Sequence, residues 1–391
     1  MGCGSLGGSC YGGAILVSPP QRILVMGDPQ APMAKVMAVL EAHAALGADG
    51  RLAGDVVLVS IGDHFDYDLE DPMGAGAEGL RTLEWLASHE PAQVRLLFGN
   101  HDAARVMELA GQADTRFAAA RALGRSIDET RRREGVEAAE RRKRDEFAAL
   151  FPDVPTSGLA ARDYASYSEA QRELVVKLLL DGRFHLALAG ALPDGREVLL
   201  THAGVTQREL ALLGLPDERD PRTLAAALET RMRAAIEARR VDWESGARTP
   251  MSLAPLHVPG EGGKEGGGLL YHRPARVDRP GGDPAWELDP TRPRRFEPRS
   301  LPRGLRQIAG HTGHRKCKAE LDDAWLTPAA RDQESGGIRT LRVSGDDVLY
   351  DLGILPDRPG AADLYLVDGE MRHVAATDYT LLPLAALFVP A

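Results

Sequence analysis

Three short apolar runs near the start of the chain each end in polar side chains suited to metal binding or catalysis. The runs cover residues 23–26, 56–61 and 94–98, and the motifs that follow them are Gly-Asp-Pro-Gln, Gly-Asp-His-Phe-Asp and Gly-Asn-His-Asp. Continuous aliphatic and β-branched runs with helical segments between them are typical of parallel strands buried on both faces. The carboxyl ends of such strands share one edge of the sheet, where ligands and metals collect. The sequence therefore predicts an α/β fold with its site at that edge.

Two later segments repeat this arrangement. Thr-His-Ala-Gly at residues 201–204 follows the apolar residues 198–200, and Gly-His-Thr-Gly-His at 310–314 follows the run 305–309. Together the five motifs offer carboxylates, an amide and imidazoles. That mixture suits Zn²⁺, Mn²⁺ or Fe rather than Ca²⁺, which takes only oxygen ligands. We therefore expect a transition-metal site built from strand ends that lie far apart in the sequence.

The order of these motifs resembles that of the calcineurin-like metallophosphoesterase superfamily. The motifs are Asp-x-(His), Gly-Asp-x-x-Asp, Gly-Asn-His-Asp, His-Ala-Gly and Gly-His, and they span Asp28 to His314. The His-Ala-Gly form is similar to the branch that holds Ser/Thr protein phosphatases and symmetrical diadenosine tetraphosphate hydrolases. The resemblance implies an α/β/β/α sandwich of two mixed sheets flanked by helices. It also implies a hydrolase of phosphoric ester or anhydride bonds.

The resemblance further implies a dinuclear metal centre of Mn, Fe or Zn, in which a metal-activated hydroxide attacks phosphorus. By similarity to the family, Asp63 bridges the two cations and Asp28 binds the first. The ligands of the second cation are then Asn100, His202 and His311.

Two catalytic residues follow from the same resemblance. His101 is expected to protonate the departing oxygen as general acid, and Asp66 is expected to hold its ring, since a carboxylate bonded to one ring nitrogen fixes the tautomer. For Asp102, beside them, we predict a structural role as a helix N-cap.

The chain departs from the family pattern at three places. Gln30 stands where the first motif usually has His, and its amide oxygen is a poorer donor, so we expect a weaker first metal site. His314 follows His311 by three positions instead of two; it is interpreted either as a ligand of the first metal or as a histidine outside the ligand set. Protein phosphatases have arginines at the positions of Tyr67 and Phe98. Without that two-arginine clamp on a phosphoryl group, we expect a small phosphorylated molecule or a dinucleotide as substrate.

Alternative functions remain at this level. One is a phosphoprotein Ser/Thr phosphatase-like enzyme, and another is a degenerate, non-catalytic metal-binding module, which the substitution at Gln30 motivates. A nuclease of the same superfamily is a third. The net charge of -10 argues against nucleic acid as a partner, because such binding needs basic surface to displace counterions.

The chain is interpreted as a flexible leader at 1–20 and one metallophosphoesterase domain at 21–391. Within the domain, residues 103–180 are rich in Ala, Arg and Glu and predict a helical insertion over the cleft, and residues 248–303 are rich in Pro and Gly and predict a loop. After the last motif, we expect antiparallel closing strands, as the resemblance implies. They are placed at residues 338–343, 348–351 and 364–367.

Cellular context follows from two further observations. The three cysteines do not form a disulfide framework, which favours a reducing, cytoplasmic location. No apolar run approaches the roughly 20 residues needed to cross a bilayer, so no membrane partner is expected. The oligomeric state is left open.

Overall fold

Two mixed sheets packed face to face form the centre of the computed structural model, which describes residues 21–276, 291–333 and 335–388. The predicted leader at residues 1–20 lies outside the described residues. The first sheet has the order β15-β1-β2-β3-β4, in which β1 to β4 run parallel and β15 is antiparallel to β1. Its strands are β1 (Arg22–Met26), β2 (Val56–Ser60), β3 (Val94–Leu97), β4 (Phe184–His185) and β15 (Leu382–Leu384).

The second sheet has the order β13-β12-β14-β11-β6-β5-β16. Its strands are β5 (Ala187–Ala191), β6 (Glu197–Thr201), β11 (Arg306–Ala309), β12 (Arg339–Ser344), β13 (Asp347–Leu352), β14 (Ala362–Leu366) and β16 (Ala386–Phe388). The predicted closing strands β12, β13 and β14 are antiparallel to one another where they pair. Strand β14 also pairs in parallel with β11, so its carboxyl end reaches the same edge as β11.

Successive side chains of a strand point to opposite faces of the sheet, so the central strands contribute to two separate layers of the core. Val25, Val59 and Leu97 of the first sheet face Leu200 and Ile308 of the second in one buried cluster. Neighbouring residues on the opposite face of the first sheet pack in a second cluster with helices α1 (Met33–Ala42), α2 (Pro72–Ala87) and α7 (Glu169–Leu180). The same cluster contains α9 (Pro221–Glu237), which packs against β5 and β6 of the second sheet. The outer face of the second sheet packs with α12 (His314–Glu320) and α13 (Pro328–Asp332). The α/β/β/α sandwich is confirmed.

The helices begin where capping chemistry permits. The carboxylate of Asp71 accepts a hydrogen bond from the backbone N–H of Gly74, and Pro72 occupies the first helical position. Both features favour a helix start. Helix α2 therefore begins at Pro72.

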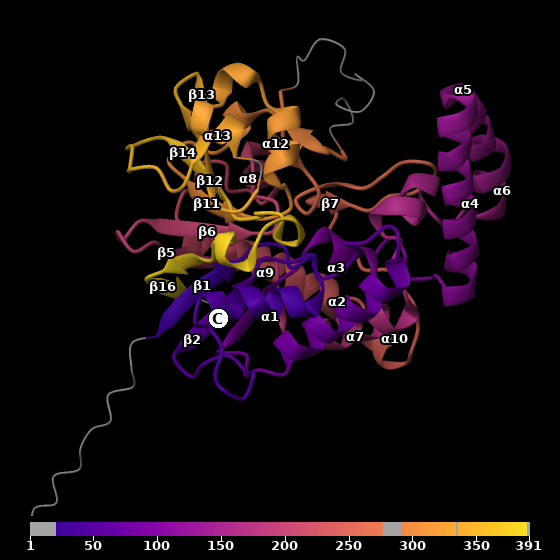
Figure 1. Cartoon of the computed structure of the whole chain (residues 1–391), viewed down its shortest axis with the longest axis horizontal. Coiled ribbons are helices and arrows are strands. Elements are labelled where there is room, and N and C mark those ends of the chain that lie inside the picture. Colours follow the sequence, from indigo (N-terminus) through magenta and orange to yellow (C-terminus); the bar gives the residue numbers. More distant parts are fainter. Residues whose placement is uncertain (1–20, 277–290, 334, 389–391) are drawn as a thin grey trace, which may run out of the picture.

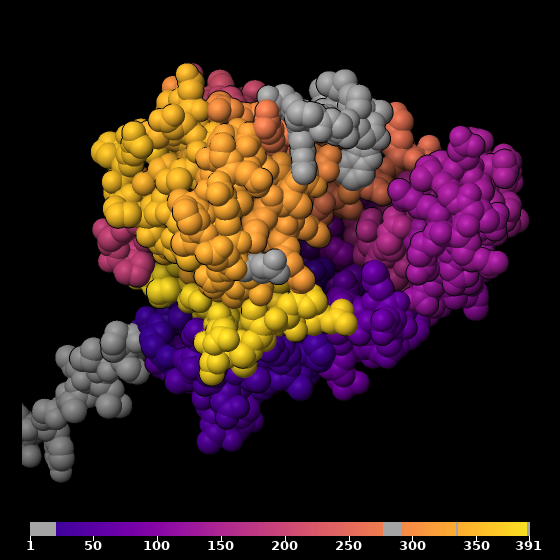
Figure 2. All heavy atoms as spheres, turned by 45° about the horizontal axis from the view of Figure 1, so that its top comes forward, coloured from indigo at the N-terminus to yellow at the C-terminus, as the bar shows by residue number. Residues whose placement is uncertain are grey.

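The part of the predicted helical insertion that precedes α7 forms a separate lobe beside the two sheets (Figures 1 and 2), whereas α7 packs in the cluster of the first sheet. A small aromatic core that includes Phe117, Phe147, Tyr164 and Tyr167 holds the lobe together. Its elements between α3 (Asn100–Ala104) and α7 are α4 (Asp114–Glu134), α5 (Val136–Arg142), the π-helical turn Lys143–Phe147, α6 (Ala148–Leu150) and the π-helical turn Leu159–Asp163.

The Pro/Gly-rich segment predicted as a loop contains short paired strands in its described part. Strand β7 pairs with β8, and β9 pairs with β10. These strands are β7 (His257–Val258), β8 (Gly267–Gly268), β9 (Arg273–Pro274) and β10 (Arg295–Phe296), and two short helices, α8 (Gln207–Leu212) and α10 (Arg240–Glu244), precede them. Within the described residues, none of the helices is both long and apolar enough to cross a membrane.

Candidate metal centre

Five strand ends bring the predicted ligands together at the carboxyl edge of the two sheets. The backbone N–H of His311, after β11, donates to both carboxylate oxygens of Asp28, after β1, at 2.9 and 3.1 Å. The Nε2 atom of His202, after β6, lies 3.1 Å from Oδ1 of Asn100 and 3.3 Å from Oδ1 of Asp63. The His202 and His311 rings pack edge to face at 5.1 Å. All five side chains are buried.

The ring of His202 presents a nitrogen to two oxygen acceptors. Its Nδ1 lies 2.9 Å from the carbonyl oxygen of Ile61. Because a carbonyl oxygen can only accept a hydrogen bond, Nδ1 carries the hydrogen and donates it to Ile61. Nε2 then faces Asn100 and Asp63. Burial lowers the pKa of His202, but the Asp63 carboxylate outweighs this and raises it to about 9. In the ion-free cluster a proton therefore occupies the place where a cation would bind, and metal binding would release it.

The ring of His311 also leaves one nitrogen for a ligand. Its Nε2 lies 2.9 Å from the carbonyl oxygen of Tyr271, which orients the ring as backbone carbonyls commonly orient metal-binding histidines. Its Nδ1 is buried and has no hydrogen-bond partner among the described residues. Burial holds the pKa of His311 well below its usual range, so the ring is neutral, the form that binds metals. His311, His202 and Asp63 each offer a ligand atom, and these atoms lie within 4.8 Å of one another.

The carboxylates of the cluster carry negative charge that a cation would offset. Burial raises the pKa of Asp28 well above its usual range, and the charges of Asp368 and Asp63 add to this. Burial likewise raises the pKa of Asp368 to about 6. Burial also acts to raise the pKa of Asp63, but His202 and His101 outweigh it and hold that pKa well below its usual range.

Strained backbone is concentrated at this edge. Asp63, Asp66 and His311 have positive φ angles of 60°, 67° and 62°, a region that non-glycine residues rarely occupy. Only five non-glycine residues in the described chain have a positive φ. Strain of this kind persists where the surrounding structure enforces it, as at functional sites.

Asp102 supports the turn that carries Asp63. The prediction of an N-cap was wrong in position, because Gly99 is the N-cap of α3 and Asp102 is its third residue. The Asp102 carboxylate accepts the backbone N–H groups of Gly99 and Asp63 at 3.1 and 3.0 Å, and its other oxygen lies 3.0 Å from Nδ1 of His64. Its role is to hold two strand exits against each other.

His101 lies beside the cluster with one ring nitrogen held by Asp66. The Nδ1 atom is 2.9 Å from Oδ2 of Asp66, and Nε2 is 3.7 Å from Oδ2 of Asp63. Asp66 is fixed in turn by the Ser166 backbone N–H at 2.8 Å and by a guanidinium nitrogen of Arg105 at 2.6 Å. Burial acts to raise the pKa of Asp66, but Arg105 and His101 hold it well below its usual range. Sequence analysis missed Arg105, one helical turn after His101.

A model of the calcineurin-like phosphoesterase family matches residues 21–208. Residues 21–208 belong to this family. The matched region contains the first four of the five motifs. Members of the family are metal-dependent phosphoester hydrolases, and this phosphoesterase is an enzyme that acts on phosphoric esters.

Other comparisons add little beyond the family. No curated protein matches this chain. Among solved structures it is similar to a cold-active protein-tyrosine phosphatase of the psychrophile Shewanella sp., with 13% identity over 93% of this chain and 75% of that chain and a TM-score of 0.38. A mutant of a cold-active protein tyrosine phosphatase gives 12% identity over 90% and 72%, with a TM-score of 0.34.

The two residues at which the phosphoesterase departs from the family pattern have different surroundings. The amide nitrogen of Gln30 donates to the carbonyl oxygen of Phe65 at 3.0 Å, which leaves its amide oxygen for a ligand, and Gln30 lines one cavity with Asp28. His314 is turned away from the cluster. Its Nε2 lies 2.9 Å from the carbonyl oxygen of Gly337, and its Nδ1 lies 3.3 Å from the Tyr350 hydroxyl. The structure therefore places His314 outside the ligand set.

Three charged residues near the cluster could not be predicted from the sequence motifs. Asp368, after β14, and Lys316, on α12, line the cavity of about 140 Å³ that also contains Asp28 and Gln30. Arg273, on β9, lies close enough for its charge to be the largest influence lowering the pKa of Lys316. Nothing in the motifs predicts that α12 and β9 contact each other, so only the folded chain shows these two cations beside the carboxylates.

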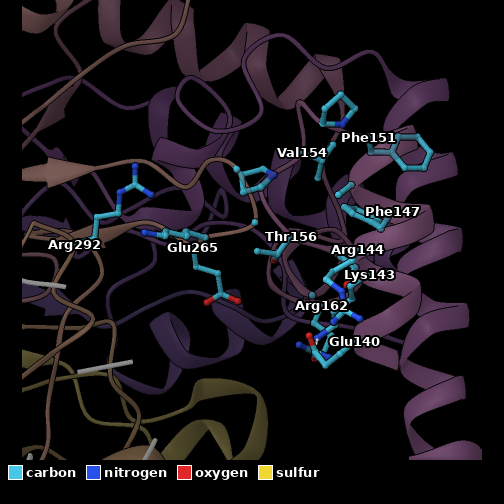
Figure 3. Close-up of a pocket in the computed structure, with 18 of the residues that line it drawn as sticks. Glu140, Lys143, Arg144, Phe147, Phe151, Val154, Thr156, Arg162, Glu265 and Arg292 are labelled. Atoms are coloured by element: carbon cyan, nitrogen blue, oxygen red, sulfur yellow. Dashed lines mark hydrogen bonds and ion pairs between the residues drawn. The ribbon is translucent and has the colours of Figure 1, made fainter. Parts of the chain in front are cut away.

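A cavity larger than the one beside the cluster lies between the helical insertion and residues 262–265. It measures about 760 Å³, and Figure 3 shows Lys143, Arg144 and Arg162 opposite Glu265 and Arg292. Four of its cations are already engaged in ion pairs, namely Lys143 with Glu140, Arg162 with Asp128, Arg292 with Glu261 and Arg294 with Glu265. Size therefore does not identify the site; the converging ligand atoms do.

Proposed function

We propose that this phosphoesterase uses two divalent metal ions to hydrolyse small phosphorylated molecules, with phosphomonoesters as the first class to test. The observation that carries the proposal is the buried set of facing ligand atoms from Asp63, His202 and His311, which has His101 beside it in a fixed orientation. Neutral imidazole, carboxylate and amide ligands of this kind suit Mn²⁺, Fe or Zn²⁺.

The ligands divide into two groups around Asp63, the expected bridge. Asn100, His202 and His311 would hold the second ion, and Asp28 with the amide oxygen of Gln30 would hold the first. When bound, the ions supply positive charge that neutralises the phosphate oxygens and lowers the pKa of a bound water from about 16 toward about 7.

His101 would hold the proton that the leaving oxygen needs. The carboxylate of Asp66 at 2.9 Å from Nδ1 orients the ring so that Nε2 points toward the side of Asp63. The Asp66 carboxylate also stabilises the protonated ring after it takes up a proton. Asp66 is therefore a positioning residue, and Arg105 positions Asp66.

Lys316 and Arg273 would bind the phosphate group in place of the missing arginine clamp. Lys316 is an exposed residue that lines the cavity with Asp28 and Asp368, and the charge of Arg273 acts on both Lys316 and His311. Phe98 stands at one of the two positions where protein phosphatases have arginine. It is fully buried and packs against Phe184, so it cannot contact a substrate. Tyr271, just before β9, contacts His311 through its carbonyl oxygen and its ring.

The decisive experiment combines turnover with metal analysis. Protein reconstituted with Mn²⁺ is expected to hydrolyse nitrophenyl phosphate faster than bis-nitrophenyl phosphate, dinucleoside polyphosphates or phosphopeptides. Asp63→Asn should abolish turnover, whereas Asp346→Asn, at a position whose side chain is 98% exposed, should leave it unchanged. A folded, metal-free protein without turnover on any of these substrates would instead support the non-catalytic module.

A further inference from the structure

Strand β14 supplies a sixth strand end at the edge where the ligands meet. Its pairing with β11 is parallel, with Leu366 opposite Ala309. Val367 and Asp368 therefore leave the sheet beside Gly310 and His311. The backbone N–H of Val367 donates to the Ala309 carbonyl at 2.9 Å, which continues the ladder to this point.

The exits of β14 and β1 are in direct contact. A Cβ atom placed on Gly27 would lie only 2.1 Å from the carbonyl oxygen of Val367. Only glycine permits this approach. The next residue on each chain segment is an aspartate, Asp28 on one and Asp368 on the other, so the contact brings two carboxylates to the same place.

The side chain of Asp368 is held at the cavity wall. It is 9% exposed, and its Oδ1 accepts the backbone N–H of Glu370 at 2.9 Å. It lines the same cavity as Asp28 and Gln30. A buried carboxylate among other carboxylates is costly unless a cation joins them.

We propose that Asp368 is a ligand of the first metal ion and takes the place of the imidazole that Gln30 has replaced. This inference rests on the proposed dinuclear function. It makes the first site rich in oxygen, with Asp28, Asp63, Asp368 and the Gln30 amide, while the second site keeps two imidazoles. Oxygen ligands favour Mn²⁺ or Mg²⁺, whereas imidazole suits Zn²⁺. The two sites therefore differ in metal preference.

Metal stoichiometry of the full-length protein tests the inference without relying on activity. After loading with Mn²⁺ and removal of free metal, wild type and Asp378→Asn should each hold two equivalents by mass spectrometry. Asp378 is an exposed aspartate ten residues further along the chain. Asp368→Asn should hold one equivalent, and adding Gln30→His to it should restore the second. When Zn²⁺ and Mn²⁺ are supplied together in equal amounts, this double variant should bind a higher ratio of Zn²⁺ to Mn²⁺ than wild type.

Two equivalents in folded Asp368→Asn would overturn the inference and leave the dinuclear function intact. Fewer than two in wild type would instead overturn the dinuclear function and this inference with it. If Asp368→Asn fails to fold, anomalous diffraction from Mn²⁺-loaded wild type decides. A metal within about 2.2 Å of an Asp368 oxygen supports the inference, and a first-site metal without that contact refutes it.

Discussion

A guanidinium nitrogen of Arg105 lies 2.6 Å from the carboxylate of Asp66, and neither side chain is exposed to solvent. This buried ion pair lies behind His101 and fixes the carboxylate that orients its ring. The pair thus links the stability of the fold to the geometry of the expected general acid.

Removing the cation should destabilise the protein strongly. We expect Arg105→Met to lower the free energy of unfolding by about 3–5 kcal/mol, because the Asp66 carboxylate is then buried without its partner. Urea denaturation measures this. The control is Arg116→Met, which breaks a pair with Asp153 whose side chains are 43% and 45% exposed, and it should change stability far less because solvent screens an exposed pair. Equal effects of the two variants would contradict the prediction.

His101→Ala should slow turnover by about 10²–10⁴-fold while leaving bound metal unchanged. The loss should be larger for alkyl phosphates than for nitrophenyl phosphate, because a nitrophenolate leaves without needing a proton. Turnover of both substrates after rapid mixing measures the ratio. If His101 only shaped the site, both substrates would slow by the same factor.

Lys316→Met should weaken phosphate binding. A charge-assisted contact contributes about 1.5–3 kcal/mol, so we expect KM for a phosphomonoester to rise at least about tenfold, with a smaller rise for a diester of lower charge. Lys318→Met, two residues further along α12, is the matched control, because Lys318 donates to the carbonyl oxygen of Arg331. An equal change in KM for both variants would remove Lys316 from the site.

The ion-free protein should lose stability at alkaline pH. The pKa of His202 is raised to about 9 from an unfolded value of about 6.5. The stabilisation is therefore complete below about pH 6.5 and is lost as pH rises through 9. Its size is on the order of 3 kcal/mol. Urea unfolding of chelator-treated protein at pH 6.5 and 9 measures the loss, which should be smaller in His202→Gln; a loss of the same size there would exclude His202 as the cause.

Gly27→Ala should destabilise the protein and reduce metal binding, because its new methyl group would collide with the Val367 carbonyl oxygen. Overpacking of this kind costs about 1–3 kcal/mol. Gly54→Ala is the control, since a Cβ there meets nothing within 4 Å. Thermal unfolding and Mn²⁺ titration report the two effects, and a Gly27 variant as stable as the Gly54 variant would show that the two strand exits separate easily.

Much of the fold was predictable because its strands are locally encoded. The runs that became β1, β2, β3 and β6 are rich in aliphatic residues, and each ends at a glycine or polar turn. Strand β11, Arg-Gln-Ile-Ala, was placed by the Gly-His motif that follows it. Strand β5 was missed because its sequence, Ala-Leu-Ala-Gly-Ala, has little intrinsic strand preference. It becomes a strand because β6 and β16 pair with it on both sides.

Some residues of the candidate site were likewise predictable from local sequence, and others were not. The motifs at five strand ends could be read from the chain, because Gly-Asp, Gly-Asn-His and Gly-His are short patterns of neighbouring residues. The folded chain was needed to show that Asp368 and Lys316 share a cavity with Asp28 and that His314 faces away. Those outcomes depend on the direction in which β14 pairs and on the packing of α12, and such contacts between distant segments leave no periodic trace in the chain.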